Sequence, residues 1–190
     1  QVDKLEEKYN LIVSSNLSDI EKIYWLVEYC KRYGTLPFAG IARSAFIATQ
    51  YLRSFVELNI FSQADFENFN NSLFTVTKKL NADLQRYYKD EISKEDFLNE
   101  YGHLMPGTYD ILSSNYRDSF DSYFSKSPGI SAPIKPSVHI SNEILNNINI
   151  FLKKSNITVD AGQLLDFIRE SIEQREMSKF RFTKVVNQIL

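Results

Sequence analysis

The residues best suited to chemistry lie in one short segment, which runs from Tyr101 to Asp110. Within ten residues it holds two of the six glycines, one of the five prolines and one of the two histidines. His103 follows an expected helix end, where backbone amides can point at a ligand, and its imidazole titrates near neutral pH. Grouped with Tyr109 and Asp110, it can form a polar pocket. The alternative is a rigid turn in which His103 and Asp110 hydrogen-bond the backbone and the tyrosines pack.

Two cations interrupt the apolar face of the last expected helix. At about 100° per residue, Arg175 and Lys179 fall on one face together with Leu165, Ile168, Ile172, Phe182, Val186 and Ile189. A cation in an apolar environment must be paired, because an isolated charge is too costly to desolvate. Either acidic side chains or a bound anion would be the partner. Arg43 and Arg53 are further candidates, for which a solvated helix face is an equally simple interpretation.

Most standard catalytic motifs are absent from the sequence. It contains no zinc-type pairing of cysteine and histidine, no metalloprotease helix and no glycine-rich fingerprint after a strand. Gly102 and Gly107 have the outer spacing of a phosphate loop, but Thr108 stands where such a loop needs its lysine.

Helices are expected to position all of these residues. Capping boxes at 18–21 and 62–65 mark two helix starts, because the first side chain bonds one free amide and the fourth bonds another. The longest apolar stripe, from 66 to 87, covers six turns, and no segment alternates as a strand does. We therefore predict an all-α, compact multi-helix domain, with helices over about 3–13, 18–33, 38–59, 62–87, 93–101, 141–154 and from 158 or 160 to the end.

The single cysteine lies on the apolar face of the second expected helix. Ile20, Ile23, Val27 and Cys30 recur at helical spacing, and Gly34 is expected to end this helix. Cys30 is therefore predicted to be a core thiol rather than a nucleophile.

Two irregular segments separate the helices. One is the Gly/Pro/His loop near 101–110. The other, near 125–141, holds Pro128, Pro133 and Pro136 and is typical of a surface loop or hinge.

Composition excludes several classes of protein. With 190 residues the chain suits a single helical domain over 1–190. Its 22 basic and 24 acidic residues leave no basic excess for nucleic acid. The most apolar stretch, 38–56, is interrupted by Arg43, Gln50 and Arg53, so it cannot span a membrane. One cysteine fits a reducing cytoplasm. Because the chain starts at Gln1 without a methionine, we expect it to be a piece of a longer protein or a chain whose start is lost.

Several short segments together carry a family resemblance. They are Gly34-Thr35-Leu36-Pro37-Phe38-Ala39, Ile41-Ala42-Arg43, Ala45-Phe46-Ile47-Ala48, Leu52-Arg53-Ser54, Tyr101-Gly102-His103-Leu104, Pro106-Gly107-Thr108-Tyr109-Asp110-Ile111, Arg175-Glu176, Lys179-Phe180 and Phe182-Thr183. This set resembles the central helical region of phosphoenolpyruvate synthase-like phosphotransferases, a family that includes pyruvate phosphate dikinase, rifampin phosphotransferase and L-glutamine kinase. The resemblance covers roughly 34–124 and 170–186.

The resemblance implies an acceptor-binding and connecting domain. Members of the family join an ATP-grasp domain, a mobile domain with a phosphorylated histidine, and an acceptor-binding region. ATP and Mg²⁺ are therefore implied for the parent enzyme, while this fragment is expected to bind no cofactor and to be inactive alone. Nothing in the chain is similar to the threonine- and glycine-rich motif of the carrier histidine, so His103 is not that residue. The implied partners are the two other domains and a small-molecule acceptor, with no nucleic acid and no membrane.

The matching positions define the predicted site, which consists of Arg43, His103, Thr108, Tyr109, Asp110, Arg175 and Lys179. His103 would orient or deprotonate the acceptor, while Arg175 and Lys179 would face the incoming phosphoryl group. Met105 departs from the family, where arginine is usual, so no anion contact is expected there. One alternative is a scaffold whose matching residues are buried in pairs. Another is a helical adaptor, with a large exposed apolar patch and no polar pocket at His103.

Overall fold

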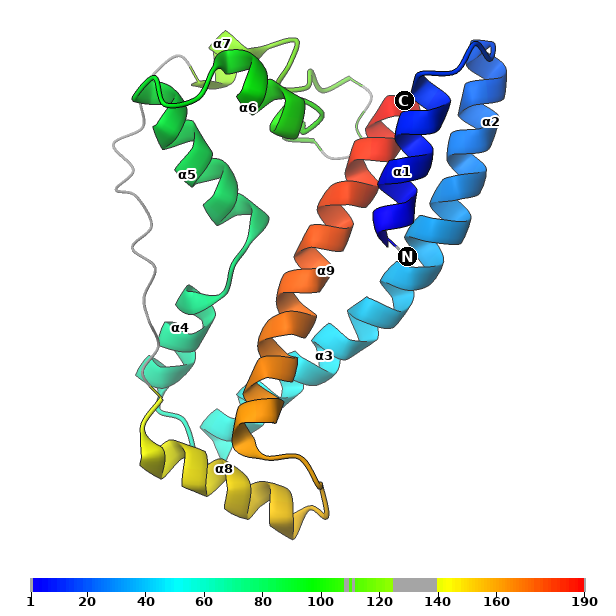
Figure 1. The fold of residues 1–190 in the computed structure, drawn as a ribbon. Coiled ribbons are helices and arrows are strands. Elements are labelled where there is room, and N and C mark those ends of the chain that lie inside the picture. The colour runs from blue at the N-terminus through cyan, green and yellow to red at the C-terminus, as the bar shows by residue number, and fades with distance from the viewer. Residues whose placement is uncertain (1, 108–109, 111, 125–139, 190) are drawn as a thin grey trace. The chain divides into compact units, whose positions relative to one another are not determined.

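The computed structural model of the protein describes residues 2–107, 110, 112–124 and 140–189. These residues form nine α-helices and one π-helix, and they include no strand, so the all-α prediction is confirmed. The elements, shown in Figure 1, are α1 (Val2–Val13), α2 (Asp19–Tyr29), η1 (Cys30–Thr35), α3 (Leu36–Glu57), α4 (Gln63–Ser72), α5 (Val76–Tyr88), α6 (Lys94–Tyr101), α7 (Phe120–Phe124), α8 (Asn142–Lys154) and α9 (Ala161–Ile189). The predicted Pro-rich loop falls almost wholly on 125–139, outside the described residues.

The chain divides into two compact units, each built from separate stretches of sequence. Unit 1 comprises Gln1–Ala39, Thr75–Pro133 and Met177–Leu190, and unit 2 comprises Gly40–Phe74 and Ile134–Glu176. Helices α3 and α9 contribute residues to both units. The expectation of a single domain over 1–190 stays a prediction.

The predicted helix starts are confirmed by their capping geometry. The backbone N–H of Ser18 donates to the Glu21 carboxylate at 2.9 Å, and that of Ser62 donates to Asp65 at 2.9 Å. Ser93 forms a third capping box at the start of α6. Each box satisfies backbone amides that the first turn leaves free, so local sequence alone determines where these helices begin.

The long stripe from 66 to 87 is not one helix, which corrects the prediction. It is divided between α4 and α5, and Leu73 between them has an extended backbone (φ −64°, ψ 140°). Ser72 donates its hydroxyl to the carbonyl oxygen of Phe69, and the hydroxyl of Thr75 caps α5 by accepting from the Lys78 N–H. Short polar side chains that bond nearby backbone groups compete with helix continuation.

Gly34 does not end the second helix, which corrects another prediction. It lies inside the π-helix η1, which joins α2 directly to α3. A Cβ on Gly34 would lie 2.5 Å from the Phe182 ring and 3.3 Å from Leu5, so the glycine permits close packing within unit 1. Gly34 and Phe182 both belong to the segments that resemble the phosphotransferase family. Their close contact shows that they are packing partners in unit 1.

Two small cores hold unit 1 together. Helices α1 and α2 run antiparallel, and the C-terminal part of α9 lies beside α1 (Figure 1). Their shared core consists of Leu5, Ile12, Leu26, Cys30 and Val185. The second core joins α5, α6 and α7 and consists of Leu84, Phe97, Leu98, Tyr101 and Phe120, with Phe180 of α9 packed against it.

The prediction that Cys30 is a core thiol is confirmed, since it is 7% exposed and burial raises its pKa to about 11. The predicted orientation of the helix is wrong at its start. Ile20 is 80% exposed and Ile23 is 43% exposed, because Leu26 and Cys30 define the face that meets α1.

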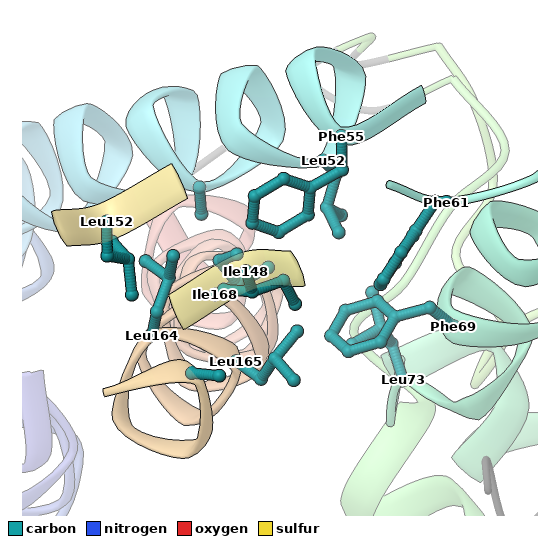
Figure 2. Packing of buried hydrophobic residues seen from close by; sticks show 12 residues of the cluster. Leu52, Phe55, Phe61, Phe69, Leu73, Ile148, Leu152, Leu164, Leu165 and Ile168 are labelled. Carbon is teal, nitrogen blue, oxygen red and sulfur yellow. The ribbon is translucent and has the colours of Figure 1, made fainter. Parts of the chain in front are cut away.

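Unit 2 has one larger core made of side chains from four helices. Figure 2 shows Leu52 and Phe55 of α3, Phe69 of α4, Ile148 and Leu152 of α8, and Leu164, Leu165 and Ile168 of α9 converging, with Phe61 and Leu73 beside them. Ala48, Phe55, Ile148 and Ile168 are fully buried. Every member of this cluster is apolar, so its stability comes from burial and close packing.

Within the described residues, no helix is both long enough and apolar enough to cross a membrane.

Candidate functional site

The segment that contains His103 begins where α6 ends. Tyr101 is buried in the α5–α7 core, and its hydroxyl donates to Asp83 at 2.6 Å. Gly102 caps α6, and a Cβ there would lie 2.4 Å from the carbonyl oxygen of Leu98. The backbone N–H of Arg117 donates to Gly102 at 3.1 Å. The chain therefore needs glycine at 102, and the backbone bond holds Arg117 beside His103.

The far end of the loop is stabilised by its own side chains. Asp110 accepts from the backbone N–H of Leu112 at 3.0 Å and from the hydroxyl of Ser113 at 3.1 Å. The backbone N–H of Asp110 in turn donates to Gly107 at 2.7 Å. This geometry is that of a rigid turn, so Asp110 has a local structural role. Thr108 and Tyr109 lie outside the described residues.

The imidazole of His103 is held in unit 1 by packing and by its own backbone. Its ring lies 4.9 Å from the Phe180 ring, between centroids, and its carbonyl oxygen accepts from the Asn187 side-chain amide at 2.6 Å. Burial, and next the positive charge of Lys184, lower the pKa of His103 to about 4, although the charge of Glu100 and hydrogen bonds with the backbone of Phe180 and Glu100 act to raise it. The ring is therefore neutral at pH 7, and it is a weak base there.

A polar pocket of about 260 Å³ lies next to His103. Its lining residues all belong to unit 1: Tyr9, Leu98, Asn99, Gly102, His103, Asn115, Arg117, Lys184, Asn187 and Gln188. Two of these residues have a buried polar atom without a hydrogen-bond partner among the described residues, Nε2 of His103 and Oδ1 of Asn187. Leaving such an atom unpaired costs about 1–3 kcal/mol, and both atoms are shielded from solvent.

Two cations line the same pocket, and acidic or amide side chains position both of them. Arg117 donates to Glu95 at 3.0 Å and to Asn99 at 2.9 Å. Lys184 lies 3.5 Å from Glu6 and 5.8 Å from the centroid of the Tyr9 ring. The bonds to Glu95 and Asn99 use two of the five N–H groups of Arg117, so the guanidinium retains donors for a ligand.

The cations singled out in the sequence lie elsewhere. Lys179 is exposed and does not line the pocket, so the expected apolar environment is wrong for this residue. In unit 2, Arg175 is half exposed, lies 3.4 Å from Glu176 and stands over the Phe46 ring at 5.8 Å. Arg43 is exposed. Of the five predicted site residues that the structure describes, only His103 lines the pocket.

Sequence reasoning missed Arg117, Lys184 and Asn187. Arg117 lies in an irregular segment without any periodicity, so its sequence carries no signal. Lys184 and Asn187 follow Phe180 at intervals of four and three residues, which places them on one face of α9. One signal was present in the sequence, because helical spacing places Lys184 and Asn187 on the same face of the last helix as Phe180. The ring of Phe180 packs on His103.

Unit 2 has a hollow of a different kind. It has a volume of about 470 Å³ and is a shallow apolar groove lined by Phe46, Ile47, Gln50, Tyr51 and Ser54 of α3 and Phe151 of α8. Its lining includes no charged side chain. Among the described residues of the whole chain, no group of three or more histidine, cysteine, aspartate or glutamate side chains is placed to hold a metal ion.

Comparison with known proteins finds no relative: no protein-family model matches the chain, and neither does any curated protein or solved structure. The likeness to phosphoenolpyruvate synthase-like enzymes therefore depends on the short segments alone.

Proposed function

We propose that this chain is the acceptor-binding and connecting helical domain of an ATP-dependent phosphotransferase similar to phosphoenolpyruvate synthase. The observation that carries the proposal is the polar pocket at His103, which occurs in the segment with the strongest family likeness. Phosphoryl transfer depends mostly on positioning and on charge stabilisation. The pocket offers two cations for charge stabilisation and several polar side chains for positioning.

Within this proposal His103 orients the acceptor rather than deprotonating it. A histidine with a pKa of about 4 is neutral at pH 7 and accepts a proton poorly. A neutral imidazole still offers one hydrogen-bond donor and one acceptor, which suits the alignment of a hydroxyl or amide. Arg117 and Lys184, rather than Arg175 and Lys179, are then the cations beside the acceptor.

The rest of the reaction belongs to other domains of the parent enzyme. In this proposal an ATP-grasp domain uses ATP and Mg²⁺ to phosphorylate a mobile histidine. The P–N bond of that phosphohistidine breaks as the acceptor atom bonds phosphorus, and the proton of the acceptor passes to the released nitrogen of the carrier imidazole. The fragment alone is inactive, binds neither nucleic acid nor membrane, and acts in the cytoplasm, where ATP is abundant.

The first test is to sequence the gene on both sides of these 190 codons. The proposal requires an ATP-grasp region upstream and a carrier-histidine domain downstream in the same reading frame. A start codon immediately before Gln1 and a stop codon after Leu190 would contradict it.

The second test applies to the full-length enzyme. His103→Ala should abolish transfer to the acceptor while ATP-dependent phosphorylation of the carrier histidine continues, because His103 lies in the acceptor pocket. Lys179→Ala is the matched control, since this exposed lysine does not line the pocket. Loss of carrier phosphorylation in the His103 variant would refute the assignment.

One observation favours a second function, that of a helical protein-interaction module. Unit 1 exposes large apolar side chains on α2, with Ile20 80% and Tyr24 59% exposed. An adaptor would use such a surface, but its hypothesis also requires that no polar pocket exist at His103, and one does. A pull-down with Ile20→Asp and Tyr24→Ser against the unchanged chain would test the module.

A further inference from the structure

We propose that the His103 pocket binds a small hydroxy acid, with the acid group facing Arg117 and Lys184 and the hydroxyl group facing Asn187. The inference rests on the proposed function only in taking this pocket as the functional site. It adds a ligand class that neither the family-like segments nor the comparisons assign.

The anionic half of the ligand follows from the cations in the pocket wall. Arg117 and Lys184 come from two different stretches of the sequence of unit 1, and both line the pocket. Lys184 has an ammonium with three N–H donors and lies 3.5 Å from Glu6, while Arg117 retains donors beyond its bonds to Glu95 and Asn99. An oxyanion uses such donors in charge-assisted hydrogen bonds.

The hydroxyl half follows from Asn187, whose Oδ1 has no hydrogen-bond partner among the described residues. Oδ1 of Asn187 can only accept a hydrogen bond, and its amide nitrogen is already engaged with the carbonyl oxygen of His103. A ligand must therefore present a donor to Asn187. A ligand hydroxyl meets this requirement, whereas the His103 imidazole already has hydrogen bonds with the backbone of Phe180 and Glu100.

The burial of Oδ1 of Asn187 and Nε2 of His103 determines how a ligand reaches them. Both are shielded from solvent, so contact requires a lining side chain to move. Gln188 is exposed at the pocket and accepts a hydrogen bond from the Tyr9 hydroxyl at 3.2 Å. A ligand can displace this single bond. At about 30 Å³ for each water-sized group, a pocket of about 260 Å³ holds roughly nine such groups, which limits the ligand to a small molecule.

The test compares three molecules of similar size with the 190-residue chain. L-Lactate has both groups, propionate lacks the hydroxyl, and 1,2-propanediol lacks the acid. Binding is measured at pH 7 by NMR, from the shifts of the His103 imidazole and the Asn187 side-chain amide. We expect lactate to bind about tenfold more tightly than either partial analogue, as the loss of one hydrogen bond or charge contact predicts. Equal binding of lactate and propionate, or no shift with lactate at about 50 mM, overturns the inference.

Variants locate the interaction on the pocket cations. Lys184→Met should weaken lactate binding about tenfold, whereas Lys179→Met should leave it unchanged, because Lys179 lies on the same helix outside the pocket. Equal losses in both variants would refute the placement. The ligand series on the unchanged chain remains decisive if Lys184→Met fails to fold.

A fourth ligand distinguishes two sources of the oxyanion. Glycerol 3-phosphate carries hydroxyls with a phosphate, and tighter binding than lactate would assign a phosphate ester, while weaker binding would assign a carboxylate. The inference and the proposed function fail separately. Lactate binding to a chain encoded by a lone gene would refute the phosphotransferase but keep the site. Phosphoryl transfer that needs His103 without hydroxy acid binding would do the reverse.

Discussion

The His103 pocket of unit 1 and the main core of unit 2 show two different uses of helical packing. In unit 2, α3, α4, α8 and α9 converge on a cluster that is entirely apolar, and its shallow groove has no charged lining residue. In unit 1, a polar hollow is lined by two cations, Arg117 and Lys184, together with His103 and Asn187. The unit 2 core is stabilised by apolar burial, whereas each buried polar group of unit 1 lowers stability unless it has a hydrogen-bond partner.

The largest expected effect comes from the unit 2 core. Phe55→Ala should lower the free energy of unfolding by about 3–5 kcal/mol, because it removes a fully buried ring and leaves a cavity. Phe46→Ala on the same helix, where the ring is 67% exposed, should change it by less than about 0.5 kcal/mol. Urea denaturation measures both. Similar losses for the two variants would contradict the packing in Figure 2.

The pH dependence of stability should distinguish the pocket from the core. The pKa of His103 is lowered from 6.5 to about 4, so the unfolded chain binds a proton between these values that the folded chain does not. The contribution of neutral His103 to the free energy of unfolding is therefore complete above about pH 6.5. It falls by about 2–3 kcal/mol as the pH drops towards 4.

Denaturation curves at several pH values would measure this loss, and His103→Gln is the control that should remove it. If His103→Gln loses as much stability in acid as the unchanged chain, the loss comes from the titration of other groups.

Two glycines on adjoining elements should respond to alanine in opposite directions. Gly34→Ala should lower the free energy of unfolding by about 1–3 kcal/mol, because its Cβ would lie 2.5 Å from the Phe182 ring. Gly40→Ala should raise it by about 0.5–1 kcal/mol, since nothing lies within 4 Å and alanine favours a helix. Thermal melting of both variants checks the pair, and a stabilised Gly34 variant would contradict the close packing in unit 1.

The smallest expected effect concerns the buried tyrosine that precedes the pocket. Tyr101→Phe should lower the free energy of unfolding by about 1–2 kcal/mol, because the Asp83 carboxylate loses the hydroxyl that donates to it at 2.6 Å. Tyr24→Phe is a matched control, as this ring is 59% exposed. Chemical denaturation compares the two, and an unchanged midpoint for Tyr101→Phe would mean that Asp83 finds water instead.

Local signals account for most of what could be predicted about the fold. The capping boxes at Ser18, Ser62 and Ser93 place helix starts, because the side chains that bond the free amides are within three residues. Periodicity identified Cys30 as buried, but it did not say which of two apolar faces would be covered. That choice depends on α1, whose contact with Leu26 and Cys30 leaves Ile20 in solvent.

The sequence by itself determined an all-helical chain, its main helix starts and the unusual loop that contains His103. Only the tertiary structure decided that Arg117, Lys184 and Asn187 meet that histidine, because these residues are 14 or more positions away and no local pattern links them. It also decided that the imidazole is neutral, since the lowered pKa of His103 follows from burial and from a lysine on α9. Helix formation depends on neighbours in the chain, whereas a binding site depends on neighbours in space.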